Sequence, residues 1–271
     1  MQGWKTLIPA AKKIEYLNAL LKVGFDRLDF GSFVSAKAIP QMADTHDVIP
    51  HLETTSSSTK LLAIIANVRG AHDAVKYDNI SYLGFPFSIS PTFQKRNANS
   101  TIEESLLRVT EIQHICLKHG KKLVVYISMG FGNPYGDEYN EGIVMNWIEK
   151  LTSLGIKVIS LADTVGIATP QQVSSLLNAV IPAYNNTEIT VHLHSSPAQQ
   201  DEKIKAALDA GCRSFDSALR GIGGCPMAHD DLVGNINTEK MISYFEENNI
   251  APDINKNALQ HALSIADSIF H

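Results

Sequence analysis

The sequence predicts an α/β protein folded as a (β/α)8, or TIM, barrel, and three observations support this fold class. Apolar segments of strand length alternate with amphipathic helices throughout the 271 residues, which is typical of a parallel sheet buried on both faces. A helix–glycine–strand unit recurs along the chain. Polar residues with possible chemical roles follow directly after several predicted strands. We expect residues 1–271 to form a single domain.

The repeated unit consists of an amphipathic helix, a glycine at its end and a β-rich segment a few residues later. It occurs at Gly24, Gly120, Gly155 and Gly211. A glycine just beyond the last helical residue readily adopts the left-handed conformation that ends a helix. Each of these glycines therefore predicts a helix end followed by a strand.

The predicted helices also carry signals at their starts. Thr169 precedes a proline, which suits an N-cap followed by the first helical turn, and Ser196 precedes Pro197 in the same way. Thr101 begins the segment TIEE, which reads as a capping box. Pro9 is expected to open the first helix.

The pattern predicts seven strands, whereas a (β/α)8 barrel has eight. The chain starts in the segment before the first helix, so we expect the missing strand to be the first. An open doubly wound sheet is the alternative, but no glycine-rich phosphate-binding segment follows any strand. Residues 255–270 are predicted to form an additional amphipathic helix. The predicted strands are 25–33, 61–67, 80–87, 122–129, 157–165, 188–196 and 214–220.

The composition is that of a globular protein that acts on a small molecule. Hydrophobic residues make up 44% and charged residues 19% of the chain, and the net charge is −5. The charges are scattered, with no basic cluster for nucleic acid and no apolar run for a membrane. The three cysteines, of which Cys116 is expected in the core, suggest a reducing, cytoplasmic location. Unpaired edges of an incomplete barrel would favour a homodimer.

Two histidines stand out at the end of one predicted strand. His192 and His194 lie in the segment VHLHS, and alternate residues of a strand share a face. The pair suits half of a metal site, although buried histidines are about as often held by backbone carbonyls. Asp29, Asp163 and Asp216 follow other strands and would lie on the same rim of a barrel.

A glycine-rich segment, GIGGCPMAHDDLVGN, follows the last predicted strand and contains Cys225 and Asn235. Such a segment is either an exposed turn or a lid that brings a proton donor over a site. The sequence by itself leaves both interpretations open.

Several segments together resemble the 3-hydroxy-3-methylglutaryl-CoA lyases, a family of metal-dependent TIM-barrel lyases. The resemblance extends in order over nearly the whole chain. The segments are GSFVSAKAIPQMAD at 31–44, NSTIEES at 99–105, ISLADTVGIATP at 159–170, VHLHS at 191–195 and GGCP…GN at 223–235.

The resemblance implies cleavage of 3-hydroxy-3-methylglutaryl-CoA, or a related hydroxy acyl-CoA, to acetyl-CoA and acetoacetate. It also implies a divalent cation, Mg²⁺ or Mn²⁺, with His192, His194 and Asn235 as ligands. Cys225 matches the family cysteine that protonates the departing enolate.

Further residues are assigned to the site by the same resemblance. Asp163 matches an active-site aspartate, and Asp29 stands where the lyases have a glutamate, which is one methylene longer. We expect Ser160 and Arg220 to bind substrate. Arg220 replaces a small residue of the lyases and would pair with a substrate carboxylate or with Asp216.

One part of the lyase pattern is absent from the printed sequence. The lyases have an Arg-Asp pair at the end of their first strand, and its aspartate is a metal ligand. We expect this pair to lie upstream of Met1, taken as an internal methionine. Loss of activity, or replacement of the ligand by Asp230 or Asp231, are the alternatives.

Two other functions remain as alternatives. A condensing enzyme of the same superfamily would join acetyl-CoA to a 2-oxo acid, but such enzymes lack the GGCP segment. A barrel that binds an acyl-CoA without catalysis is the second alternative.

Overall fold

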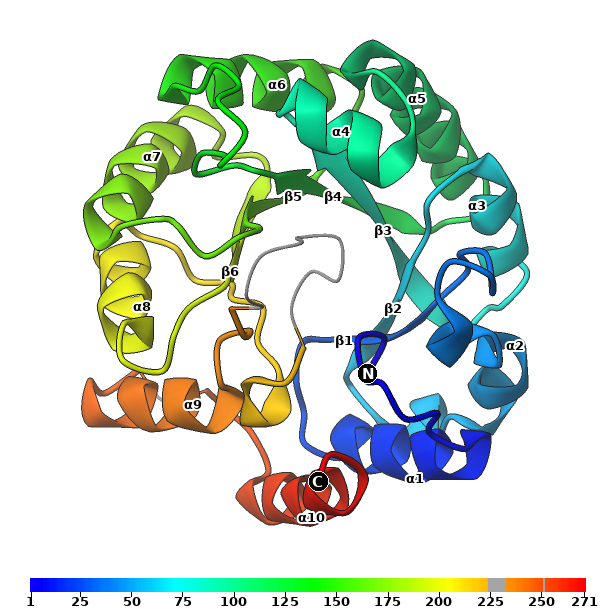
Figure 1. Ribbon diagram of the computed structural model, residues 1–271. Helices are drawn as coiled ribbons and strands as arrows, with labels where there is room; N and C mark the ends of the chain where they lie inside the picture. Colours follow the sequence, from blue (N-terminus) through cyan, green and yellow to red (C-terminus); the bar gives the residue numbers. More distant parts are fainter. Residues whose placement is uncertain (224–232, 251) are drawn as a thin grey trace.

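The centre of the molecule is a parallel six-stranded sheet in the order β1-β2-β3-β4-β5-β6. The computed structural model describes residues 1–223, 233–250 and 252–271. Each strand pairs with the next strand along the chain, and the sheet curves round the centre of the molecule as an open ring with β1 and β6 at its two ends (Figure 1). The strands are β1 (Arg27–Ser32), β2 (Lys60–Ile64), β3 (Ile80–Ser88), β4 (Lys122–Ser128), β5 (Val158–Asp163) and β6 (Glu188–Leu193).

The helices lie outside this ring and form an outer layer (Figure 1). The longer ones are α1 (Ala10–Leu21), α5 (Ile102–Lys118), α6 (Glu141–Ser153), α7 (Pro170–Ala183), α8 (Gln200–Asp209), α9 (Thr238–Glu247) and α10 (Lys256–Ile269). The shorter ones are α2 (Thr45–Val48), α3 (Val68–Ala74) and α4 (Pro91–Ala98), with 3-10 turns at Pro40–Met42, Ile49–His51, Thr54–Ser56 and Leu219–Gly221.

The two end strands of the sheet, β1 and β6, approach each other through side chains. Arg27 at the start of β1 forms an ion pair with Glu188 at the start of β6. The same guanidinium donates a hydrogen bond of 3.1 Å to the Ser214 hydroxyl. Within the described residues, β1 and β6 are not paired as strands.

The parallel strands alternate along the chain with helices that cover the sheet. This arrangement confirms the predicted α/β class with a buried parallel sheet.

The seventh predicted strand, 214–220, is not formed. Its start lies beside β6, where the Val191 N–H donates to the Ser214 carbonyl at 3.1 Å and the Asp216 N–H donates to the Val191 carbonyl at 2.9 Å. The chain then turns away through Leu219–Gly221, where Arg220 has a left-handed φ of 60°. The apolar pattern predicted a strand here, but the pairing with β6 is limited to the isolated bridge of Phe215 with Val191, and Ala218 forms its bridge with Asn237 instead.

Most of the predicted helix boundaries are confirmed. Thr101 and Thr169 both form capping boxes. The helix predicted over 255–270 is present as α10, which packs against α1. The four glycines after helices all have positive φ angles: Gly24 91°, Gly120 65°, Gly155 82° and Gly211 92°.

The helix start predicted at Ser196 and Pro197 is wrong. Helix α8 begins at Gln200, and its N-cap residue Gln199 makes no side-chain cap. The preceding residues form a turn in which the Gln199 N–H donates to the Ser196 carbonyl at 3.1 Å. Ser195 is held by the Gly234 carbonyl at 3.0 Å, so the chain is still bound to a neighbouring segment where the helix was expected to start.

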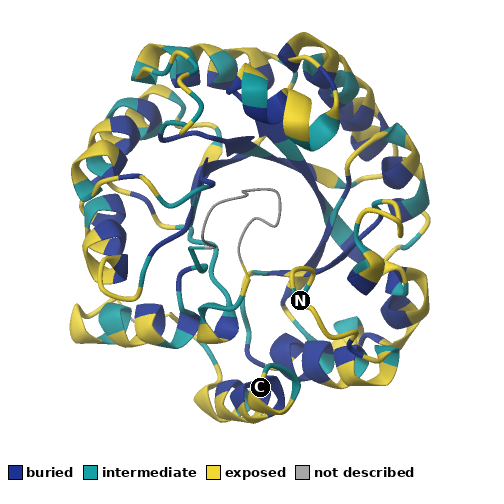
Figure 2. Ribbon diagram, viewed as in Figure 1, coloured by how far each residue is buried: buried dark blue, intermediate teal, exposed yellow. Residues whose placement is uncertain are grey.

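Apolar side chains fill both sides of the sheet. A large cluster packs the helices onto its outer face and includes the fully buried Cys116, as predicted. A smaller cluster inside the ring consists of Leu62, Val124 and Val158 with partly buried neighbours. Figure 2 shows the buried positions facing each other across these layers. In the described part of the chain, the helices are too short or too polar to cross a membrane.

Gly84 on β3 marks a place inside the ring where no side chain fits. A Cβ atom there would lie 2.7 Å from Ile64 and 2.9 Å from Tyr126. We expect G84A to lower the free energy of unfolding by about 1–3 kcal/mol, because these side chains must move from their packed positions. Urea denaturation measures the difference. G3A is the control, since a Cβ at Gly3 meets nothing within 4 Å, and an equal loss in both variants would contradict the packing explanation.

Candidate active site

Two imidazoles converge at the carboxyl end of β6. His192 lies within the strand and His194 one residue beyond it. Their Nε2 atoms are 3.3 Å apart, and the ring planes are inclined by 62°. The prediction that both side chains share a face is confirmed, because alternation along the strand directs both rings to the same place.

The carboxylate of Asp216 orients His192. The Nδ1 atom of His192 is 3.1 Å from Asp216 Oδ2, and the Ser160 hydroxyl donates to the same oxygen at 3.4 Å. The edge of the Tyr126 ring packs against the imidazole. A proton on Nδ1 is therefore directed to Asp216, which leaves Nε2 facing His194. Ser160 is predicted to bind substrate. Its hydroxyl contacts Asp216, which in turn contacts His192.

The two histidines have different affinities for protons. Burial acts to lower the pKa of His192, but the hydrogen bond and the charge of Asp216 outweigh it and raise the pKa above its ordinary value. Burial, and next the neighbouring His192, lower the pKa of His194 to about 4. At neutral pH, His194 is therefore uncharged. The two Nε2 atoms, 3.3 Å apart, face each other, and uncharged imidazole nitrogens are good metal ligands.

Asn235 lies beside this pair. It forms an isolated antiparallel bridge with His194, and its side chain interacts with the His194 ring. Its amide Nδ2 donates to the Ile222 carbonyl at 2.9 Å. The structure therefore brings together the three predicted metal ligands, and the orientation of the Asn235 amide leaves its oxygen as the atom able to bind a cation.

Asp163, the last residue of β5, is buried in an ion pair that the sequence-based interpretation missed. Its Oδ2 accepts a bond of 2.7 Å from Lys203, and the Ala168 N–H is 3.2 Å from both carboxyl oxygens. Burial raises the pKa of Asp163, and the Lys203 ammonium opposes this. Both oxygens of this buried carboxylate therefore already have hydrogen-bond donors within the protein. A catalytic role for Asp163 stays a prediction.

Lys203 was detectable in principle. The buried positions of α8 are 200, 203, 204, 207 and 208, which is the spacing of an apolar stripe. A lysine at such a position needs a buried partner. The pattern predicts that partner's existence but not its identity.

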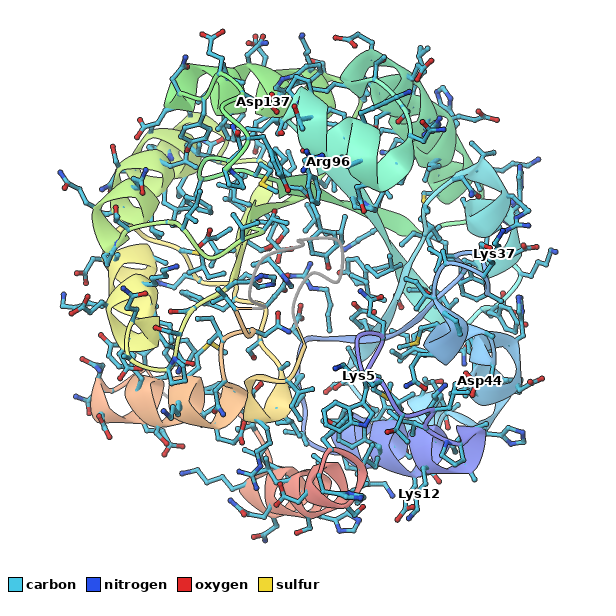
Figure 3. The ribbon with its side chains drawn as sticks, viewed as in Figure 1. Lys5, Lys12, Lys37, Asp44, Arg96 and Asp137 are labelled. Carbon is cyan, nitrogen blue, oxygen red and sulfur yellow. The ribbon has the colours of Figure 1, made fainter. Side chains whose placement is uncertain are left out.

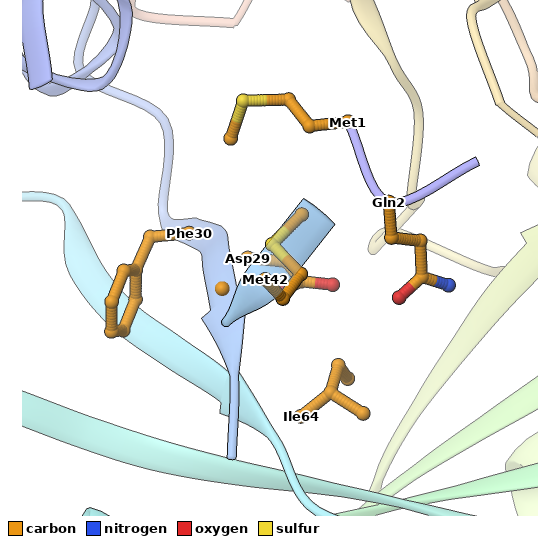
Figure 4. Close-up of a pocket in the computed structure, with 7 residues that line it drawn as sticks. Met1, Gln2, Asp29, Phe30, Met42 and Ile64 are labelled. Carbon is orange, nitrogen blue, oxygen red and sulfur yellow. The ribbon is translucent and has the colours of Figure 1, made fainter. Parts of the chain in front are cut away.

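Asp29 on β1 lies on the inner side of the ring in a pocket of its own. Asp29 lines this pocket together with Met1, Gln2, Met42 and Ile64 (Figure 4). Water reaches the side chain, yet the protein that surrounds it raises the pKa of the carboxyl to about 7 by desolvation. The charge of His192 also acts on Asp29, so both groups face the same interior.

The position of Arg220 differs from the prediction. Its guanidinium binds Asp267 of α10 through Nε at 2.8 Å and Nη2 at 2.7 Å, and Glu239 of α9 through Nη1 at 3.0 Å. The expected pairing with Asp216 is not formed, because two carboxylates on the outer helices bind the guanidinium instead. This geometry gives no support to a substrate contact by Arg220.

Two further predictions concern the metal site and the thiol. In residues 1–223, 233–250 and 252–271, no group of three or more His, Cys, Asp or Glu side chains is arranged to hold a metal. The candidate ligands that the described residues bring together are the two imidazoles and the Asn235 amide. Cys225, the predicted proton donor, lies outside the described residues.

Comparison with known proteins decides the family. The family model described as HMGL-like matches residues 2–266. The chain belongs to the HMGL-like family. The resemblance found in the sequence motifs is thereby confirmed.

Named relatives of this HMGL-like protein are lyases. It is 31% identical over 271 residues to the mitochondrial hydroxymethylglutaryl-CoA lyase of Mus musculus, covering 99% of this chain and 81% of the relative. It is 29% identical over 268 residues to the (R)-citramalyl-CoA lyase of Chloroflexus aurantiacus, covering 96% and 84%. These relatives place the protein among the carbon–carbon lyases.

A solved lyase has nearly the same backbone as the HMGL-like protein. The HMG-CoA lyase from "Acenitobacter baumannii", solved in complex with coenzyme A and 3-methylmalate, has a TM-score of 0.91 and 32% sequence identity. The match covers 99% of this chain and 87% of that one. The strands and outer helices of this chain are therefore arranged as in that solved lyase.

The control of His192 by Asp216 leads to a prediction. We expect D216N to lower the pKa of His192 by about 1 pH unit or more, because the opposing charge that favours the imidazolium is lost. A pH titration of the histidine ring signals by NMR measures this. D267N, which changes a carboxylate on α10, is the control and should leave His192 unchanged. An unaltered pKa in D216N would show that Asp216 does not set the charge of His192.

Proposed function

We propose that this HMGL-like protein is a divalent-cation-dependent lyase that cleaves 3-hydroxy-3-methylglutaryl-CoA to acetyl-CoA and acetoacetate. The observation that carries the proposal is the convergence of His192 and His194 through their Nε2 atoms, 3.3 Å apart, beside Asn235. Two ligands at right angles on an ion with bonds of about 2.1 Å would be about 3 Å apart. The spacing of the two nitrogens therefore fits neighbouring positions of one cation.

His192, His194 and Asn235 would hold the cation, either Mg²⁺ or Mn²⁺. When bound, such an ion supplies Lewis-acid polarisation of the substrate oxygens. The protein prepares the nitrogens for this task in two ways. Asp216 accepts the Nδ1 proton of His192 and so directs Nε2 inward. Burial keeps His194 uncharged, with its Nε2 lone pair available.

Proton transfer needs a base and an acid within the same space. Cleavage removes a proton from the substrate hydroxyl, and we assign this to Asp29. Its carboxyl faces the interior of the ring, and its pKa of about 7 suits a base near neutral pH. We propose Cys225, which lies outside the described residues, as the group that protonates the enolate. Ser160 would act by holding Asp216 rather than by binding substrate directly.

The acyl group and several larger features stay proposals. A citramalyl-CoA is the second candidate substrate, because the Chloroflexus aurantiacus relative carries that name at 29% identity. We propose that the six-stranded sheet is the larger part of a (β/α)8 barrel. A homodimer and a cytoplasmic location are likewise predictions that rest on the sequence.

A turnover assay separates the proposed function from its alternatives. Purified protein with Mn²⁺ or Mg²⁺ is given 3-hydroxy-3-methylglutaryl-CoA and, in parallel, (R)-citramalyl-CoA. We expect acetyl-CoA and acetoacetate from the first thioester, and we expect H192Q to reduce the rate at least about 100-fold, since it removes a ligand. EDTA should abolish turnover.

Other results would point elsewhere. In a separate mixture of acetyl-CoA and a 2-oxo acid, release of free CoA would identify a condensing enzyme. Binding of the thioester without turnover would identify a noncatalytic acyl-CoA-binding protein.

The role of Asp29 predicts a characteristic pH dependence. A base must be deprotonated to act, so we expect kcat to rise as the pH increases through about 7. D29N should lower kcat at least about 100-fold and lose this dependence. D26N is the matched control, because the Asp26 side chain is 83% exposed and only three residues away. A D29N enzyme with the wild-type profile would exclude Asp29 as the base.

A further inference from the structure

Lys203 is a lysine on the buried face of helix α8. Its side chain is 2% exposed, and its partner Asp163 is 1% exposed. Burying an ammonium group is unfavourable unless each of its protons finds an acceptor. The acceptors around Lys203 therefore show which segments of the chain this residue holds together.

The ammonium has three protons and three acceptors. It donates to Asp163 Oδ2 at 2.7 Å, to the His194 carbonyl at 2.9 Å and to the Gly166 carbonyl at 3.1 Å. These acceptors belong to the end of β5, the turn that follows it, and the segment just past β6. One nitrogen atom thus joins three segments of the rim, and no proton is left over.

His194 depends on these segments because it lies beyond the last residue of β6. Its carbonyl is bound by Lys203. Its ring donates a hydrogen bond to the backbone of Thr164, the residue next to Asp163. Both the main chain and the ring of His194 are therefore fixed against the segment that the Asp163–Lys203 pair holds in place.

We propose that Lys203 is a positioning residue that, with Asp163, fixes His194 so that its Nε2 faces His192 and would be available to the proposed cation. The inference rests on the proposed function, because it assigns the pair to the same metal site. It differs from a purely stabilising ion pair in one respect. Loss of the Lys203 donors should weaken metal binding even in a protein that remains folded.

A double substitution separates the two roles. D163N/K203M removes both charges together, so no unpaired charge is left buried, but it also removes the donor to the His194 carbonyl. We expect the dissociation constant for Mn²⁺, measured by isothermal titration calorimetry, to rise at least about tenfold, the usual effect of removing a group that orients a ligand. Circular dichroism and thermal unfolding verify that the variant is folded.

The chain offers a matched control in its other buried lysine. Lys13 of α1 is 3% exposed and binds Asp44 at 2.6 Å. Asp44 lies at the outer side of the ring near α2, away from the centre (Figure 3). K13M/D44N removes this second lysine–aspartate pair, whose aspartate side chain is 26% exposed. We expect it to change the melting temperature while the Mn²⁺ dissociation constant stays within about twofold.

Each outcome has a distinct meaning. A folded D163N/K203M protein with wild-type Mn²⁺ affinity would overturn the positioning role and leave the proposed function intact. Wild-type protein that binds no Mn²⁺ would overturn the proposed metal site, and this inference with it. If the double variant does not fold, K203Q replaces it, since glutamine can donate to only part of the acceptor set. Weaker Mn²⁺ binding by folded K203Q supports the proposal, and unchanged binding contradicts it.

Discussion

The parallel pairing of β5 with β6 is the constraint on which the site depends. Ala162 pairs with His192 and Asp163 with Leu193, so both strands end at the same level of the ring. This common level lets one lysine on α8 reach the ends of both strands, and it places the histidine pair at the rim rather than among the apolar side chains inside the ring. A shift of one residue would turn both imidazoles toward the helices.

The charges near the histidines are arranged as two separate pairs. Asp216 faces His192, whereas Asp163 faces Lys203 and is shielded from the rim. Each of these carboxylates thus has its own positive or proton-donating partner. Asp29 differs because burial raises the pKa of its carboxyl by more than the nearby Met1 ammonium and His192 lower it.

Local signals in the sequence predicted much of the fold. Glycines with positive φ ended helices and threonine capping boxes began them, because these features depend on neighbouring residues alone. Alternation along one strand correctly paired His192 with His194. Predictions that depended on residues distant in the sequence were less accurate. The segment 214–220 is apolar enough for a strand but turns at Arg220. Arg220 itself binds Asp267, which lies 47 residues away, and Lys203 binds Asp163 from a different helix–strand unit.

Asn235 serves two purposes with one side chain. Its NH₂ group binds the Ile222 carbonyl and so joins the segments on either side of residues 224–232. An aspartate in its place would be a stronger ligand but would have no proton for that carbonyl. The main chain therefore favours a neutral ligand. The three proposed ligands of the described chain are therefore all neutral, and none of them would offset the charge of a divalent ion.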